Sequence, residues 1–410
     1  MVHVYDQLID LLNAHPNMGE MGWVPEEQAR DWSEPVICVE GQNLGISLKV
    51  IPQLLSEAYG RLKTLDYDPT CLEGQRREEV NRASLCLLLL QPESNLGLNA
   101  RRFLLLQADI GMIKREMRWI DLSQSWPKNS KSSALWCYRR WVVGQEERMM
   151  GEDAGLWRWR EDRWGKEREA CRRACERHAR NYAAWTYRLH LLPEAPGEDM
   201  EAPGKMMQRG RILDGLEQEE RFSQAWTEEH LVDSSGWNYR RAVLARRSTW
   251  DSGFRVVDRE VRRVQEMLDR YPGHQVLWNH LQLCLVPPIL GQDEKEGNET
   301  WRDTLQRTIE WIKGKCTVPQ QERWALTALI FLYRQIPDSL VGLIHEDQVQ
   351  NEWVMRMIRS SSHPSSETKE PFTRANEYHH QTPPHHPMLQ ARQEQARILM
   401  TRQCARKREA

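Results

Sequence analysis

The chain carries at residues 180–188 the segment Arg180-Asn181-Tyr182-Ala183-Ala184-Trp185-Thr186-Tyr187-Arg188, whose last four residues form a W-x-Y-R tetrad. The tetrad occurs twice more, as Trp136-Cys137-Tyr138-Arg139 and as Trp237-Asn238-Tyr239-Arg240. The 410 residues include 18 Trp, 10 Tyr and 57 Lys+Arg, so chance predicts far less than one such tetrad. The recurrence therefore indicates an internal repeat, and this repeat decides the fold.

Two degenerate copies flank the three tetrads. The upstream copy, Leu98-Asn99-Ala100-Arg101, has Leu in place of the indole, and the downstream copy, Trp278-Asn279-His280-Leu281, has lost the arginine. The five positions 98, 136, 185, 237 and 278 lie 38, 49, 52 and 41 residues apart. Spacings of this size are typical of stacked helix pairs with insertions. We interpret residues 144–166 as one such insertion.

Each copy reads as two helices joined by a turn. In the third copy a charged segment, 167–180, precedes Asn181, which we predict to be the N-cap of the second helix. In the fifth copy, Pro272-Gly273 ends the first helix before the segment that carries Trp278 begins. The sequence therefore predicts an all-α protein, a right-handed α-α superhelix built as a solenoid of helix-pair repeats.

The tetrad residues are predicted to be mainly structural. Residues three apart on a helix share one face, so each Trp can pack between neighbouring helix pairs while each Arg reaches across the stack. The predicted structural set is Trp136, Tyr138, Arg139, Asn181, Trp185, Tyr187, Arg188, Trp237, Tyr239, Arg240 and Trp278.

The pattern divides the chain into four predicted regions. Residues 1–79 form an N-terminal segment with a partly helical leader, and residues 80–290 hold five helix-pair repeats. Residues 291–358 are predicted to form a C-terminal helical cap. Residues 359–410 are rich in Ser, Pro and His at their start and are predicted to be largely disordered.

The charge balance argues against a nucleic-acid-binding protein. The formal net charge is −2, whereas nucleic-acid binders usually carry a basic excess. Mean hydropathy is −0.72, and no apolar run is longer than residues 85–90, far short of the about 20 residues that a membrane helix needs. The segment Met1–Asp6 has no basic head like that of a signal peptide. We expect a cytoplasmic protein with no nucleic-acid partner and no membrane insertion.

Cysteine and histidine spacing indicates no metal site. The nine cysteines are scattered and form no CxxC pair, which is typical neither of a disulfide framework nor of a zinc site. Four histidines of the tail lie in a Pro-rich segment and are not predicted to hold a metal ion; they are His379, His380, His385 and His386. We therefore expect no metal and no cofactor in this chain.

The repeat resembles that of protein prenyltransferase α subunits, with the strongest likeness at residues 180–188 and a span of about residues 80–285. Two other stretches resemble one branch of that family, the prenyltransferase α-subunit repeat-containing proteins. The first stretch is Met21-Gly22-Trp23-Val24-Pro25 followed by 34–40, and the second is Tyr271-Pro272-Gly273-His274 leading into Leu277-Trp278.

The resemblance implies a crescent of helix pairs that wraps a separate β subunit. In such heterodimers the β subunit holds the catalytic zinc and most of the prenyl diphosphate pocket. The resemblance assigns to Arg180 a place beside the isoprenoid diphosphate, and to Tyr182 a place at the substrate channel. The alternatives are a solvated arginine at a helix junction and a tyrosine with a packing role.

Two functions follow as hypotheses. The first is the α subunit of a protein prenyltransferase that attaches an isoprenoid, geranylgeranyl by resemblance, to a cysteine near the C-terminus of a target protein. Its partners would be a β subunit and that protein substrate. The alternative is a non-enzymatic α-solenoid scaffold for a protein complex in trafficking.

Overall fold

The computed structural model describes residues 3–39, 42–64, 74–106, 108–150, 156–193, 206–250, 253–285 and 297–335. All of them belong to one compact unit, Met1–Gln348. The predicted tail, 359–410, and its four histidines lie outside the described residues, and the predicted cap is described only over 297–335.

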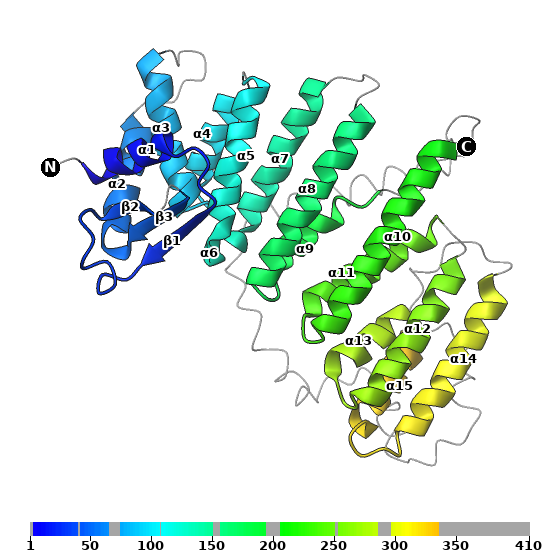
Figure 1. Ribbon diagram of the computed structural model, residues 1–410. Helices are drawn as coiled ribbons and strands as arrows, with labels where there is room; N and C mark the ends of the chain where they lie inside the picture. Colours follow the sequence, from blue (N-terminus) through cyan, green and yellow to red (C-terminus); the bar gives the residue numbers. More distant parts are fainter. Residues whose placement is uncertain are drawn as a thin grey trace, which may run out of the picture. The chain divides into compact units, whose positions relative to one another are not determined.

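The described residues form six helix pairs in chain order, which confirms the predicted all-α array of helix-pair repeats (Figure 1). The pairs are α3 (Gly74–Leu90) with α4 (Asn95–Leu105), α5 (Ile110–Ser125) with α7 (Ser133–Met150), α8 (Leu156–Arg177) with α9 (Tyr182–Leu189), α10 (Met206–Glu229) with α11 (Ser234–Ser248), α12 (Gly253–Arg270) with α13 (Gln275–Cys284), and α14 (Gly297–Lys315) with α15 (Glu322–Gln335). A short helix, α6 (Pro127–Ser130), lies in the turn of the second pair.

Helix length accounts for part of the unequal repeat spacing. Residues 144–150 continue α7 and residues 156–166 begin α8, so the interpretation of 144–166 as an insertion is wrong for the part that the structure describes. Helices α8 and α10 have 22 and 24 residues, against 16 in α5. Longer first helices therefore account for much of the wider steps before positions 185 and 237.

A small β-sheet precedes the repeats, where the sequence predicted only a partly helical leader. Helix α1 (Val4–Ala14) is followed by β1 (Glu20–Val24), β2 (Val36–Val39), β3 (Asn43–Ser47), a 3-10 turn (Leu48–Val50) and α2 (Ile51–Thr64). The strand order is β1-β3-β2, with β1 parallel and β2 antiparallel to β3. The predicted boundary between residues 79 and 80 falls inside α3.

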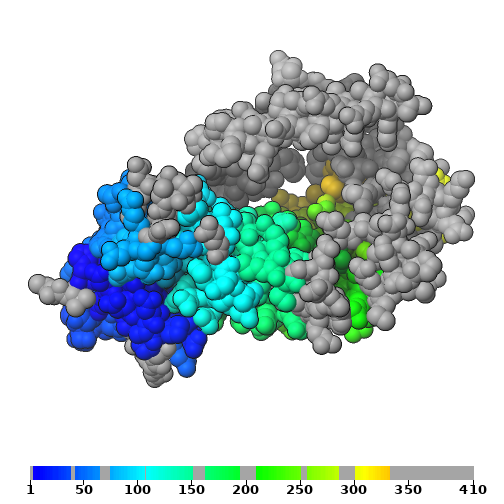
Figure 2. All heavy atoms as spheres, turned by 90° about the horizontal axis from the view of Figure 1, so that it is seen from above, coloured from blue at the N-terminus to red at the C-terminus, as the bar shows by residue number. Residues whose placement is uncertain are grey.

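The sheet packs directly on the first repeats (Figure 2). Trp23 of β1 stacks on Trp126 with 5.1 Å between ring centroids. The backbone N–H of Met21 donates to Ser125 Oγ at 2.9 Å. Helix α2 packs along α3, so the N-terminal segment covers the open end of the helix array.

From α7 onward, the second helix of each pair packs on the second helix of the next pair. Helix α7 contacts α9, α9 contacts α11, α11 contacts α13 and α13 contacts α15. These helices begin at side-chain N-caps in several repeats. Asn181 Oδ1 accepts from the N–H of Ala184 at 3.2 Å, and its Nδ2 donates to the Ser130 carbonyl at 3.0 Å, which ties α9 to the preceding repeat.

A buried carboxylate joins consecutive repeats from the α3–α4 pair to the α12–α13 pair. Glu167 of α8 is fully buried and accepts from Arg139 of the preceding repeat, Nε at 2.5 Å and Nη2 at 3.0 Å. The hydroxyl of Tyr187, in the same repeat as Glu167, donates to it at 2.6 Å. One carboxylate therefore satisfies the arginine of one tetrad and the tyrosine of the next.

The same unit recurs at three other junctions. Glu116 binds Arg101 and Tyr138, Glu219 binds Arg188 and Tyr239, and Glu260 binds Arg240 and His280. Glu167, Glu219 and Glu260 lie 20 residues before their aromatic partner, and Glu116 lies 22 before Tyr138. We call these four clusters the Arg–Glu–aromatic units.

The degenerate tetrads end the series. In the first copy Ala100 replaces the tyrosine, and no tetrad arginine precedes it. In the last copy Leu281 replaces the arginine and packs in an apolar cluster with Leu305 of α14. Because a buried unpaired arginine or carboxylate is costly, an array with ends needs apolar residues at these two places.

The indoles make a second repeated contact. Trp136 lies against Tyr187, Trp185 against Tyr239 and Trp237 against His280, with ring centroids 4.9, 5.0 and 4.7 Å apart. All six rings are buried. Each tetrad thus packs its Trp on the aromatic residue of the next tetrad while its Arg binds the next carboxylate.

In two of the units the surroundings of the glutamate favour its ionised form. Burial would raise the pKa of Glu167, but Arg139, together with Arg163 and the Tyr187 hydroxyl, outweighs it and the pKa lies below its usual value. The same holds for Glu260, where Arg240, His280 and Arg263 hold the pKa well below the usual range. Burial, and then the adjacent carboxylate, raise the pKa of Tyr138, Tyr187 and Tyr239 well above 10, so these phenols remain donors.

Removing one of these carboxylates should destabilise the array strongly. Glu219→Ala leaves Arg188 and Tyr239 buried without their acceptor, and we expect a loss of about 3–5 kcal/mol in the free energy of unfolding. Glu217→Ala, two residues upstream in α10, removes an exposed pair with Arg221 and should cost about 1 kcal/mol or less. Urea denaturation measures both, and equal losses would contradict the structural role of the Arg–Glu–aromatic units.

The last unit should make stability depend on pH. Burial lowers the pKa of His280 below 6.5 although Glu260 opposes this, so the unfolded chain takes up a proton that the folded chain resists. The contribution of neutral His280 to the free energy of unfolding is therefore fully present above pH 6.5 and is lost as the pH falls below that value. His280→Tyr restores the residue of the other tetrads, and its phenol does not titrate in this range.

We expect the unfolding free energy of the unaltered protein to fall more steeply between pH 6.5 and 5.5 than that of the variant. The unaltered protein should lose at most about 1.4 kcal/mol more than the variant over this range, the equivalent of one pKa unit. The other histidines are common to both proteins and cancel in the comparison. Parallel pH profiles in denaturant melts would show that His280 carries no such linkage.

Candidate functional site

The turn between α8 and α9 presents the two residues predicted to act in catalysis. Arg180 has φ +57°, and no other non-glycine residue among those described has a positive φ. The N–H of Tyr182 donates to the Arg180 carbonyl at 2.9 Å. In the repeat of α12 and α13 the residue before the N-cap is Gly273, with φ +79°. Arg180 thus holds a left-handed conformation that suits glycine.

Both side chains face solvent. Tyr182 is 68 % exposed and Arg180 is also exposed. Among the described residues, no carboxylate lies within ion-pair distance of Arg180. Between them the buried Asn181 side chain holds the start of α9. The turn therefore fixes an unpaired guanidinium and a phenol on the surface at the beginning of a helix.

The remaining predicted residues lie inside. The indole, phenol and guanidinium groups of the three tetrads are buried, as are Asn181 and Trp278; the set is Trp136, Tyr138, Arg139, Asn181, Trp185, Tyr187, Arg188, Trp237, Tyr239, Arg240 and Trp278. Their contacts are those of the Arg–Glu–aromatic units, the paired aromatic rings and the N-cap. The structure thus separates Arg180 and Tyr182 from the tetrad residues between which they lie in sequence.

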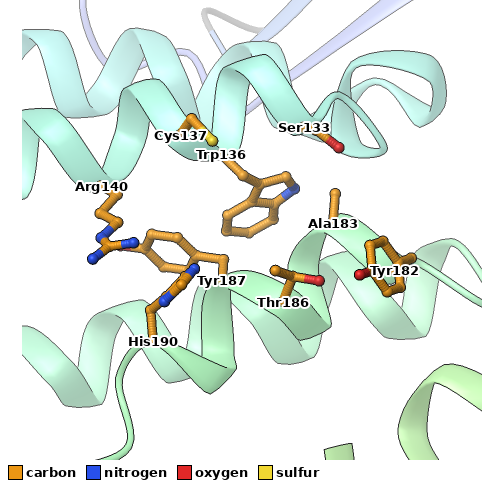
Figure 3. Close-up of a pocket in the computed structure, with 9 residues that line it drawn as sticks. All are labelled: Ser133, Trp136, Cys137, Arg140, Tyr182, Ala183, Thr186, Tyr187 and His190. Atoms are coloured by element: carbon orange, nitrogen blue, oxygen red, sulfur yellow. The ribbon is translucent and has the colours of Figure 1, made fainter. Parts of the chain in front are cut away.

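A hollow of about 80 Å³ lies between α7 and α9, and Tyr182 stands at one end of it (Figure 3). Helix α7 contributes Ser133, Trp136, Cys137 and Arg140, and helix α9 contributes Tyr182, Ala183, Thr186, Tyr187 and His190. We call it the α7–α9 hollow. Pockets for small-molecule ligands usually exceed about 300 Å³, so this hollow does not enclose an isoprenoid chain.

The far end of the hollow carries two basic side chains. Arg140 and His190 lie there together, away from Tyr182 (Figure 3). Partial burial, and then the charge of Arg140, lower the pKa of His190 below 6.5. Cys137 is exposed on the same wall.

Sequence reasoning missed the four glutamates and the hollow. The glutamates have a signal in the sequence, a carboxylate 20 or 22 residues before each aromatic partner. The hollow has none of its own, since its two walls come from residues about 50 positions apart. In the part of the chain that the structure describes, no cluster of three or more His, Cys, Asp or Glu has the arrangement of a metal site. No described helix is both long enough and apolar enough to cross a membrane.

The comparisons with known proteins agree with the predicted resemblance. A model of the protein prenyltransferase α-subunit repeat matches residues 164–195, which include the α8–α9 junction. Protein prenyltransferase α-subunit repeat-containing protein 1 of Danio rerio is 25 % identical over 319 residues, which cover 66 % of this chain and 69 % of that protein. The Homo sapiens protein of the same name is 26 % identical over 318 residues, 66 % of this chain and 74 % of its own.

A third relative is similar in extent. The Xenopus laevis protein 1-B of that name is 24 % identical over 311 residues, 65 % of this chain and 67 % of its own. The matched repeat, the relatives and the array of helix pairs agree in showing that this chain is similar to prenyltransferase α-subunit repeat proteins.

Proposed function

We propose that this chain is the α subunit of a heterodimeric protein prenyltransferase, which transfers a geranylgeranyl group to a cysteine near the C-terminus of a target protein. A separate β subunit would hold the catalytic zinc and most of the isoprenoid pocket. The observation that carries the proposal is the repeat match at residues 164–195, because it covers the turn that presents Arg180 and Tyr182.

The chemistry assigns a role to each of these residues. Prenyl transfer breaks the bond between C1 of the isoprenoid and the diphosphate and forms a thioether on the target cysteine. Negative charge grows on the departing diphosphate, and a guanidinium beside it stabilises that charge. Arg180 would supply this cation, and the Tyr182 hydroxyl would donate a hydrogen bond to the same group. Zinc in the β subunit would supply activation of the target thiol.

The conformation of Arg180 supports this assignment. A left-handed non-glycine residue costs about 1–2 kcal/mol, and such strain is concentrated at functional sites. Gly273 shows that the position before an N-cap accepts glycine in this array. A role for its charge accounts for a strained and exposed arginine at the equivalent place in the α8–α9 turn.

Reconstitution tests the proposal directly. The chain is co-expressed with each prenyltransferase β subunit of its host, and the complexes are purified and supplied with labelled farnesyl or geranylgeranyl diphosphate and a protein substrate. We expect one stable heterodimer with zinc-dependent transfer of geranylgeranyl. A chain that remains apart from every β subunit would exclude the proposal and favour the alternative, a scaffold in trafficking.

Arg180→Gly separates the charge of Arg180 from its backbone. Relief of the left-handed strain, less the added flexibility of glycine in the unfolded chain, should raise the free energy of unfolding by about 0.5–1 kcal/mol. Loss of the guanidinium should lower the transfer rate about 10- to 100-fold, a usual cost of removing one electrostatic group.

The matched control is Arg180→Lys, which keeps both the charge and the strain and should retain most of the transfer. Heterodimer formation, followed by size-exclusion chromatography, should be the same for all three proteins. Full transfer by a heterodimer carrying Arg180→Gly would show that Arg180 is a solvated arginine with no part in the transfer.

A further inference from the structure

The α7–α9 hollow exists because two neighbouring repeats depart from the others at one position. The second residue of the tetrad is Asn99, Asn238 and Asn279 in three copies, and it is Cys137 and Thr186 in the two copies that form the hollow. Cys and Thr side chains end at the γ atoms, one atom short of Asn. Two short side chains on facing helices leave a gap above the rings beneath them.

The floor of the hollow is apolar and aromatic. The rings of Trp136 and Tyr187 lie 4.9 Å apart between centroids, and Ala183 lies beside them. The volume, about 80 Å³, is roughly half of the ~150 Å³ that an apolar cavity needs to take up benzene. It suits one aliphatic side chain, and it is too small for a 15- or 20-carbon isoprenoid.

The two basic side chains at its end, Arg140 and His190, have no acidic partner among the described residues. Arg139 is buried and bound by Glu167, whereas Arg140, the next residue of α7, is exposed. Among the described residues, no carboxylate lies within ion-pair distance of Arg140 or His190. The positive charge beside an open apolar hollow is therefore complementary to a carboxylate that another molecule would bring.

We propose that the α7–α9 hollow anchors a segment of a partner protein in which an aliphatic side chain stands next to an aspartate or glutamate. The aliphatic side chain packs on Trp136 and Tyr187, and the carboxylate binds Arg140 and, when protonated, His190. An apolar anchor in a desolvated hollow with a charged rim is the usual anatomy of a binding hot spot. Of the residues that line the hollow, Tyr182 at its opposite end is the one with a role in the proposed prenyl transfer, and the anchor proposed here uses Trp136, Tyr187, Arg140 and His190 instead.

A peptide selection identifies the occupant by its chemistry. A phage-displayed library of random 12-residue peptides is panned on the full chain and counter-selected on the double variant Cys137→Asn/Thr186→Asn. That variant places in the hollow the residue that the other repeats carry, so the fold should be retained; thermal unfolding of each variant verifies this. We expect the enriched peptides to share an aliphatic residue beside Asp or Glu.

Binding of a labelled selected peptide is then measured by fluorescence polarisation. Arg140→Glu should weaken binding about tenfold or more, because it places like charges together, and Cys137→Asn/Thr186→Asn should weaken it to a similar extent. The matched control is Arg118→Glu, an exposed charge reversal on α5, which should leave the dissociation constant within about twofold.

Three results would overturn the proposal. The first is a selection in which no enriched peptide distinguishes the chain from the double variant. The second is enrichment of peptides without an acidic residue, or binding that Arg140→Glu leaves unchanged. The third is displacement of the peptide from the isolated chain by geranylgeranyl diphosphate, which would make the hollow a lipid subsite. None of these results depends on a β subunit or on transfer activity, so they leave the proposed enzymatic function to its own test.

Discussion

The array depends on a buried carboxylate that two consecutive repeats share. Burying Glu167, Arg139 and the Tyr187 hydroxyl removes three polar groups from water, a cost that only well-formed mutual hydrogen bonds offset. Those bonds form when the first helix of one repeat lies between the second helices of two repeats. A shift of one helix by a residue would leave a charge buried and unpaired. The units therefore fix the register between repeats, while the stacked indoles and apolar clusters supply most of the favourable burial.

The tetrad made the helix pairs predictable, because Trp, Tyr and Arg at fixed positions are rare enough to stand out. The glutamates could not be singled out in the same way: α10 alone carries Glu217, Glu219, Glu220, Glu228 and Glu229, and only Glu219 binds Arg188 and Tyr239. The sequence did not predict the sheet, for a different reason. Strands of four or five residues, such as Val36–Val39, are too short to establish a period of two, and their pairing is set by contacts with α1 and α5 that are distant in sequence.

The candidate site shows the same limit. The motif placed Arg180 and Tyr182 correctly at a helix junction, since Asn181 is a recognisable cap. The left-handed backbone of Arg180 is a property of the folded turn, and glycine is the residue that would have signalled it. The hollow is harder to predict than the turn. Cys137 and Thr186 are 49 residues apart, and neither residue by itself indicates a hollow. Only the stacking of α7 on α9 brings their short side chains to one place.

Adjacent residues of a helix face different directions and can therefore have different roles. This decides whether a match to the repeat indicates the fold or the activity. Arg139 points inward to Glu167 and Arg140 points outward to the hollow, although they are neighbours in sequence. The matched residues 164–195 include Glu167, Asn181, Trp185, Tyr187 and Arg188, all of them buried in structural contacts. A match to the repeat is therefore chiefly a match to the scaffold. The proposed activity rests instead on exposed residues between the tetrads, Arg180 and Tyr182, and such residues can change while the repeat persists.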